Sequence, residues 1–159
     1  MTFSRPGRSA RDMAVMIVKI SVFILTSVAA YMDITREKVS NKWLLIWFLA
    51  AVAADISGLG VCSLKEAAVG TILPVVILAV FFCLRLIGAG DIKLLCVLGA
   101  FIGAQDILFC MLLSFVFAVA AALVHGMFTH VGANEIRVKR VHVAVYIFAA
   151  AVLWIGGVY

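Results

Sequence analysis

Aspartates are the side chains whose type and placement in this chain best suit chemistry. There are five, all within or beside long apolar runs: Asp12, Asp33, Asp55, Asp91 and Asp106. An ionisable side chain in such a run is costly to bury in lipid, so each is a functional candidate by default. Which of them act together depends on the elements that carry them.

The composition indicates that these elements lie in lipid. Hydrophobic residues make up 66% of the 159 residues, charged residues make up 13%, and the mean hydropathy is +1.22. Soluble domains carry about 25% charged residues, and a soluble fold of this size could not hide so much apolar surface. The sequence predicts an all-α polytopic membrane protein, one domain over residues 1–159 with a short tail at 1–12. It excludes a soluble nucleotide-binding domain and a disulfide scaffold.

Six apolar stretches approach or reach the roughly 20 residues that a helix needs to cross a bilayer. They cover residues 13–32, 43–61, 67–84, 87–104, 107–128 and 141–158. They are apolar on every side, whereas strands of a membrane barrel alternate in polarity. We therefore expect about six transmembrane helices.

The order of the spans sorts the aspartates by side of the membrane. Asp33 ends the first span and Asp91 begins the fourth, so both face the side of the odd-numbered loops. Asp55 is near the end of the second span and Asp106 follows the fourth, so both face the other side. Two pairs can therefore meet, Asp33 with Asp91 or Asp55 with Asp106.

Basic residues indicate which side is cytoplasmic. The odd-numbered loops hold eight lysines and arginines. Cytoplasmic loops are enriched in these residues, so we expect the odd loops, Asp33 and Asp91 in the cytoplasm and both termini outside. Arg5, Arg8 and Arg11 in the tail oppose this orientation.

Local sequence separates the two pairs. Asp91 follows Gly88-Ala-Gly90, and two glycines let a peptide backbone approach the carboxylate closely. Asp55 and Asp106 have the surroundings of helix-end or interfacial residues. Two facing carboxyls share a proton, so one can take a proton from water while the other polarises a peptide carbonyl. The pair Asp33 and Asp91 thus predicts amide hydrolysis without a nucleophilic side chain.

Metal and cofactor chemistry has no support in the residue spacing. The four cysteines, Cys62, Cys83, Cys96 and Cys110, show no CxxC spacing and are interpreted as packing residues. His125, His130 and His142 have no carboxylates at ligand spacing beside them, which favours interfacial or packing roles. We expect no metal and no cofactor. The net charge of +5 is interpreted as a topology signal and not as nucleic-acid binding.

Lys93 and Arg36 follow their aspartates closely along the chain. Two roles are open for each: tuning the aspartate pair, or anchoring the helix end at the lipid headgroups.

The segment Gly88-Ala-Gly-Asp-Ile-Lys-Leu-Leu, continuing to Gly99-Ala-Phe-Ile-Gly103, resembles the GxGD motif of the type IV prepilin peptidases. The segment from Asp33 to Asn41 resembles the family's first aspartate motif, with Ser40 where proline is usual. The resemblance implies a six-helix aspartyl peptidase with Asp33 and Asp91 as catalytic dyad. It also implies that Gly88, Gly90, Lys93 and Asn41 belong to the active-site turn and its surroundings.

The same resemblance implies a function and its setting. The chain looks like the short form associated with tight-adherence (Flp-type) pili, which lacks the cysteine-bearing segment and methyltransferase activity of the long members. We expect an inner-membrane enzyme that cleaves leaders from prepilins or pseudopilins at the cytoplasmic face, with the bilayer and pilus assembly machinery as partners. The alternatives are an archaeal-type preflagellin peptidase, an ion or proton transport protein that uses the same aspartates, and a noncatalytic assembly subunit.

Overall fold

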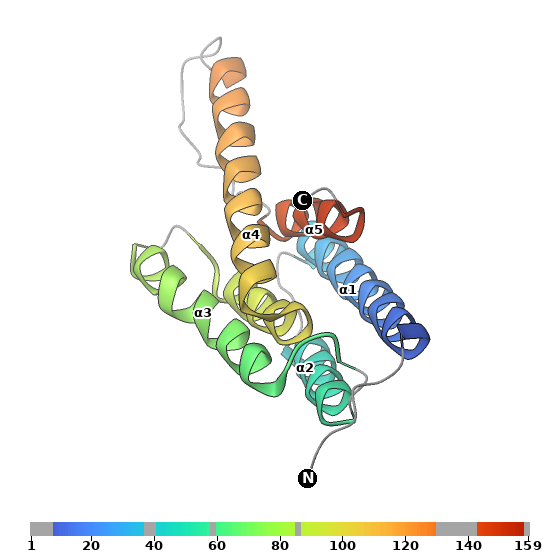
Figure 1. Ribbon diagram of the computed structural model, residues 1–159. Helices are drawn as coiled ribbons and strands as arrows, with labels where there is room; N and C mark the ends of the chain where they lie inside the picture. The colour runs from blue at the N-terminus through green and yellow to red at the C-terminus, as the bar shows by residue number, and fades with distance from the viewer. Residues whose placement is uncertain (1–7, 37–40, 58–59, 85–86, 130–142, 158–159) are drawn as a thin grey trace.

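Helices make up the regular structure of the described part of the chain, in agreement with the predicted all-α class. The computed structural model describes residues 8–36, 41–57, 60–84, 87–129 and 143–157. The elements are α1 (Arg8–Arg36), α2 (Asn41–Ile56), α3 (Leu64–Cys83), α4 (Ala89–Thr129) and α5 (Val143–Ile155), with no strand among these residues. They lie side by side in one bundle (Figure 1).

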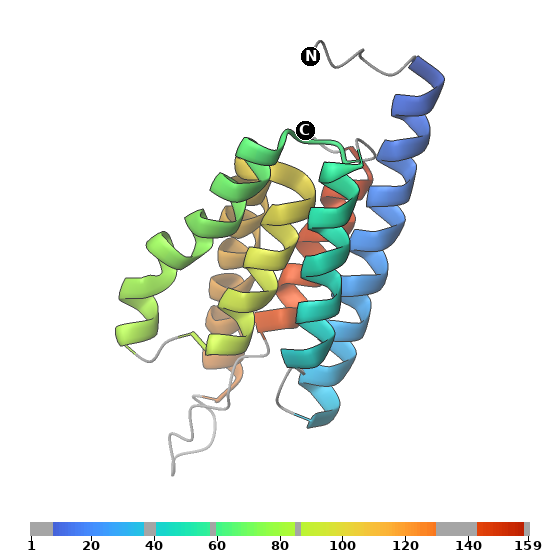
Figure 2. The ribbon, with the colours of Figure 1, turned by 90° about the horizontal axis from the view of Figure 1, so that it is seen from below.

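The element α4 consists of two helices joined at Gly103. This glycine has φ 83° and ψ 179°, a backbone conformation that disfavours residues with a Cβ atom. The N-terminal half (residues 89–102) and the C-terminal half (residues 104–129) fold back on each other (Figure 2). The sequence places the ends of these two spans at 104 and 107. The reversal occurs slightly earlier and at a single residue, because the glycine makes the turn that a loop would otherwise make.

Counting the halves of α4 separately, the described residues contain six helical segments in the predicted order. Among the described residues, three helical stretches have the length and apolar composition of a membrane span: Asp12–Thr35, Leu64–Cys83 and Ala89–Ala121, the last of which covers parts of both halves of α4. α2 has 16 residues and α5 has 13, so the count of six crossings stays a prediction.

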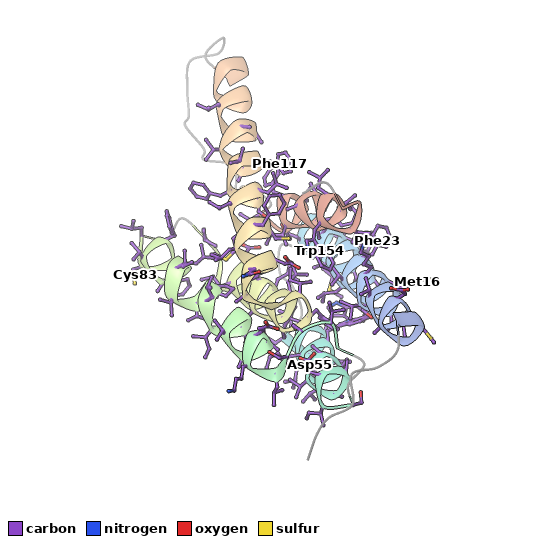
Figure 3. The ribbon with its side chains drawn as sticks, viewed as in Figure 1. Met16, Phe23, Asp55, Cys83, Phe117 and Trp154 are labelled. Atoms are coloured by element: carbon purple, nitrogen blue, oxygen red, sulfur yellow. The ribbon has the colours of Figure 1, made fainter. Side chains whose placement is uncertain are left out.

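The outer surface of the bundle is apolar, as expected for a protein solvated by lipid. The side chains of Val76 and Leu112 are 66% and 67% exposed. Met16 and Cys83 lie on the outside of the bundle as well (Figure 3). A soluble protein rarely exposes large contiguous apolar areas, so these surfaces support the assignment of an all-α membrane protein.

Successive helical segments alternate in direction (Figure 2). One end of the bundle therefore holds the end of α1 and the start of α4, which carry Asp33 and Asp91. The opposite end holds the end of α2 and the turn at Gly103, near which Asp55 and Asp106 lie. The predicted sorting of the aspartates by end of the bundle is confirmed; the side of the membrane that each end faces stays a prediction.

The N-terminal half of α4 forms the centre of the core and packs closely on α3. Leu94 and Leu98 on this half are fully buried. A Cβ atom on Gly70 would collide with the carbonyl oxygen of Gly99, and one on Gly99 would collide with that of Gly70. Pro74 lacks the amide that would bond to the Gly70 carbonyl within α3. Small residues thus bring the two helix backbones into direct contact, as in other membrane helix pairs.

The start of α3 is fixed by a reciprocal pair of hydrogen bonds. The Ser63 amide donates to Glu66 Oε2 at 2.8 Å, and the Glu66 amide donates to Ser63 Oγ at 3.3 Å. This capping box satisfies amides that otherwise lack partners at a helix start. It explains why α3 begins at Leu64, before the apolar stretch expected from residue 67.

Helices α1 and α5 are joined through a lysine within the first span. Lys19 Nζ donates to the carbonyl oxygen of Ile155, the last residue of α5, at 3.0 Å. The carbonyls of a helix end carry partial negative charge and lack intrahelical partners. The Phe23 ring also contacts Phe148 on α5, with ring centroids 5.9 Å apart. The lysine therefore has a specific partner in an otherwise apolar region.

Candidate active site

Asp91 lies in the first turn of α4, where the backbone holds its carboxylate. The Gly88 amide donates to the Asp91 side chain. The amides of Asp91 and Ile92 donate to the Gly88 carbonyl at 3.2 and 3.4 Å. The start of a helix carries partial positive charge, which favours a carboxylate at this position. The short turn from Gly88 to Asp91 thus fixes the position and the electrostatic environment of the acid.

Asp33 approaches the same place from the last turn of α1. Its side chain is partly buried, and its Oδ2 atom is shielded from solvent. The charge of Asp33 acts on the Asp91 carboxyl, so the two groups lie near each other across the boundary between α1 and α4. The structure therefore brings near each other one of the two aspartate pairs that the order of spans allows to meet.

Lys93 and Asn41 also meet at this end of the bundle. Lys93 Nζ donates to Asn41 Oδ1 at 3.1 Å, although 52 residues separate them along the chain. Asn41 is the first residue of α2, and Lys93 lies in the first turns of α4. Both side chains are exposed. Their contact joins the start of α2 to the start of α4 beside Asp91.

The two glycines before Asp91 have different surroundings. A Cβ atom on Gly88 would lie 3.1 Å from Asp91 Oδ2, which is closer than most such contacts and would press on the carboxylate. A Cβ atom on Gly90 would meet nothing within 4 Å. Neither glycine has a positive φ. The fold therefore leaves open space at Gly90, and a second molecule can approach the backbone there.

A comparison of the sequence with models of protein families finds one match. The model of the type IV leader peptidase family matches residues 20–123, which is more than half of the chain. The chain belongs to the type IV leader peptidase family. No curated protein and no solved structure matches the chain. The matched range includes every residue that the sequence placed at the site.

Membership of the leader peptidase family implies that the protein is a peptidase. The structure also gathers a second group of acids, away from Asp33 and Asp91. At the opposite end of the bundle, the side chains of Asp55, Glu66 and Asp106 all act electrostatically on Cys62. Cys62 Sγ lies 4.0 Å from Asp55 Oδ1, and 3.7 Å from each of the carbonyl oxygens of Ala100 and Phe101. These acids therefore gather around a thiol.

The Cys62 thiol lies against the last carbonyl oxygens of the N-terminal half of α4. The helix break at Gly103 leaves carbonyls at the end of the preceding half helix without intrahelical donors, and the thiol is a weak donor to two of them. Burial, together with the negative charges of Asp55, Glu66 and Asp106, raises the pKa of the thiol to about 11. A protonated, half-buried thiol suits a packing role.

Metal ligation finds no support in the described part of this leader peptidase. Among those residues, no group of three or more histidine, cysteine, aspartate or glutamate side chains is placed to hold an ion. The side chains of His125, His130, His142 and Arg36 lie outside the described residues. The four cysteines are free.

The contact between Lys93 and Asn41 is the feature of the site that sequence reasoning missed. Both residues were assigned to the surroundings of the turn, but not to each other. Hydrogen bonding between them depends on the rotation of α2 against α4, which apolar periodicity does not determine. The retained asparagine eight residues after Asp33 was the available signal.

Proposed function

We propose that the protein is a membrane-embedded aspartic endopeptidase that removes leader peptides from Flp-type prepilins. Asp33 and Asp91 form its catalytic dyad, and the site faces the cytoplasm at the inner membrane. The observation that carries the proposal is the approach of two carboxyls from α1 and α4 next to the open backbone at Gly90. The membership of the leader peptidase family supports the same chemistry.

The proposed reaction needs one proton shared between the two carboxyls. The ionised carboxylate takes a proton from water, and the water oxygen attacks the carbonyl carbon of the scissile peptide. The protonated carboxyl donates its proton to the carbonyl oxygen, which gives a neutral tetrahedral intermediate. The intermediate then collapses: the protonated carboxyl donates a proton to the leaving amine, the C–N bond breaks, and the other carboxylate takes a hydroxyl proton from the intermediate. The products are a carboxylic acid and an amine, and the dyad again holds its single shared proton without a covalent enzyme intermediate.

The residues around the dyad serve to position the substrate. The peptide lies extended over Gly88 and Gly90, where the open space at Gly90 accepts its backbone. The bond between Lys93 and Asn41 holds the starts of α2 and α4 in register beside it. A basic leader stays in the cytoplasm near anionic lipid, so the scissile bond lies at the membrane interface. The enzyme cleaves without methylating the new N-terminus.

Co-expression with candidate prepilins tests the proposed function. We expect a shift to the mature form on a gel, with mass spectrometry locating the cut between the basic leader and the apolar segment. A chelator leaves the rate unchanged, because the dyad supplies both acid and base. An unshifted prepilin with folded enzyme, or activity lost to a chelator and restored by zinc, would contradict the proposal.

A further inference from the structure

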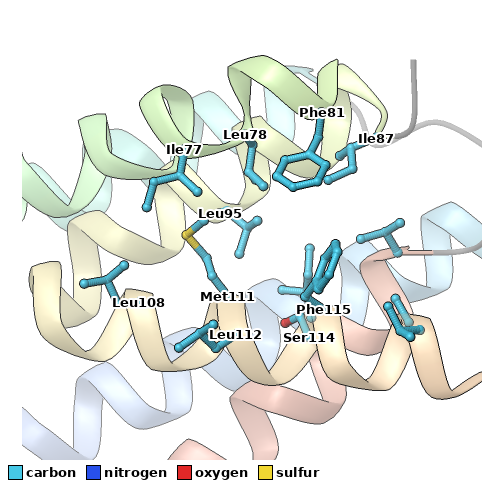
Figure 4. Close-up of a pocket in the computed structure, with 14 residues that line it drawn as sticks. Ile77, Leu78, Phe81, Ile87, Leu95, Leu108, Met111, Leu112, Ser114 and Phe115 are labelled. Carbon is cyan, nitrogen blue, oxygen red and sulfur yellow. The ribbon is translucent and has the colours of Figure 1, made fainter. Parts of the chain in front are cut away.

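An apolar groove opens on the side of the bundle between α3 and the two halves of α4, with α5 at one edge. We call it the α3–α4 groove and define it by Phe81, Ile87, Leu95, Leu108, Leu112 and Phe115 among its lining residues. Its volume is about 500 Å³. Figure 4 shows Phe81, Ile87 and Phe115 toward one end and Leu108 toward the other.

The α3–α4 groove reaches the start of α4, the helix that carries Asp91. Ile87, in the turn just before α4, and Leu95, about one helical turn after Asp91, both line it. Helix positions four apart are neighbours on one face, so the groove begins about one helical turn from Asp91. The lining residues of the C-terminal half run from Leu108 to Val119. At 1.5 Å per residue this is about 16 Å, along the direction in which the bundle crosses the membrane.

The groove is open to the surrounding lipid along its length. Leu112 is 67% exposed, Phe115 is 47% exposed and Leu108 is 38% exposed, although all three line it. A molecule already in the membrane can therefore enter from the side.

The lining suits a helix and excludes an extended chain. The polar side chain among the lining residues is that of Ser114, and its hydroxyl already donates to the Cys110 carbonyl at 2.6 Å. The groove thus gives no partner to a free backbone amide or carbonyl. In lipid, backbone groups must be bonded internally, which an apolar α-helix achieves. A groove of about 16 Å accommodates about 11 residues of such a helix.

We propose that the α3–α4 groove binds the apolar helical segment of the substrate that follows the scissile bond. This inference rests on the proposed function and names the surface by which the substrate is held. The helix lies along the C-terminal half of α4, and its unwound start reaches Gly90 and Asp91. Binding in the groove then fixes how far the chain projects toward the dyad, so the groove selects which peptide bond is cut.

Two alanines on the same half of α4 provide a matched test. Ala118 lines the groove, whereas Ala120 is exposed elsewhere on the helix. With a full-length prepilin that the wild-type enzyme cleaves, Ala118→Trp should raise KM about tenfold or more, with a smaller change in kcat. Ala120→Trp should leave both within about twofold. Equal effects of the two substitutions, or none, would overturn the groove assignment.

Photo-crosslinking gives a second measurement that does not depend on turnover. p-Benzoylphenylalanine in place of Phe115, in the Asp91→Asn background, should crosslink the apolar segment of the bound prepilin. The same probe in place of Ala120 should crosslink lipid alone. Crosslinking of lipid alone from both positions would assign the groove to acyl chains and overturn the proposal. Failure of these two experiments would refute the groove assignment without refuting the role of Asp33 and Asp91. Activity retained in Asp33→Asn or Asp91→Asn would instead refute the proposed function.

Discussion

The two ends of the bundle each gather acidic side chains, but they use them differently. At one end, Asp33 and Asp91 come from different helices and act on each other beside an open glycine. At the other end, Asp55, Glu66 and Asp106 surround Cys62, whose thiol lies against the carbonyls left by the break in α4. The difference shows that acid content alone does not define a site. Access for a peptide backbone separates the two ends.

The largest effect is expected when a carboxyl group is replaced by an amide, and the same replacement at the opposite end of the bundle serves as the control. We expect Asp33→Asn and Asp91→Asn each to reduce prepilin cleavage by about 100-fold or more, since positioned acid–base groups contribute about 10²–10⁴-fold. Asp55→Asn and Asp106→Asn should retain cleavage within about threefold. Initial rates of cleavage in purified, folded protein measure the contrast. Equal losses at the two ends would remove the distinction between them.

Replacing a glycine by valine should impair cleavage at one end of the bundle and stability at the other. Gly90→Val adds bulk where a Cβ atom meets nothing within 4 Å, so stability is retained, but cleavage should fall about tenfold or more because the branch crowds the peptide. A Cβ atom on Gly60 would collide with Asp55. Gly60→Val should therefore cost about 1–3 kcal/mol of stability, as overpacking does.

Thermal unfolding and cleavage rates, measured on both glycine variants, separate the two effects. Gly90→Ala, with a smaller side chain, serves as the intermediate case. Normal cleavage by Gly90→Val would show that the peptide does not lie over this turn.

Removing the hydrogen bond between Lys93 and Asn41 should have a smaller effect on cleavage. Lys93→Met and Asn41→Ala each remove one partner of an exposed contact, and such polar contacts contribute about 1 kcal/mol. We expect cleavage to fall by about two- to tenfold in each variant. If the pair acts as a unit, the double variant should lose no more than the single variants. Additive losses in this double-mutant cycle would show independent roles.

Replacing Cys62 should have the smallest effect on activity. Because its pKa is raised to about 11, the thiol stays protonated at pH 7.5, and only the thiolate reacts with alkylating agents. Alkylation in the folded protein should be slower than in the denatured protein by on the order of 100-fold. Cys62→Ala should cleave at the wild-type rate. Fast labelling under native conditions would contradict a packing role.

Span order places Asp33 and Asp91 at one end of the bundle and Asp55 and Asp106 at the other, because successive helices alternate in direction. The glycines before Asp91 then single out the first pair as the site. The sequence also predicts the start of α4 at the turn before Asp91, since the glycines and the first apolar residues mark it. Distances and pairings across helices were not predictable in this way. The contact of Gly70 with Gly99 and the bond from Lys93 to Asn41 depend on how far each helix is rotated.

The break between the halves of α4 was predicted within a few residues, but its form was not. The polar residues Gln105 and Asp106 mark a boundary between two spans, whereas the sequence does not show that the chain reverses at Gly103 alone. A positive φ at one glycine is enough to reverse the chain there. The α3–α4 groove was also beyond sequence analysis, because it follows from the angle between the halves of α4 and the position of α3.

The bond between Lys19 and the end of α5 has a consequence for how the chain is made. A lysine within the membrane costs about 2.5–3.5 kcal/mol on insertion scales, and its partner, the Ile155 carbonyl, is translated 136 residues later. We therefore expect the first helix to enter the bilayer before this partner of Lys19 exists. A chain truncated before α5 would lack the Ile155 carbonyl, and we expect its first helix to be held less firmly in the bilayer.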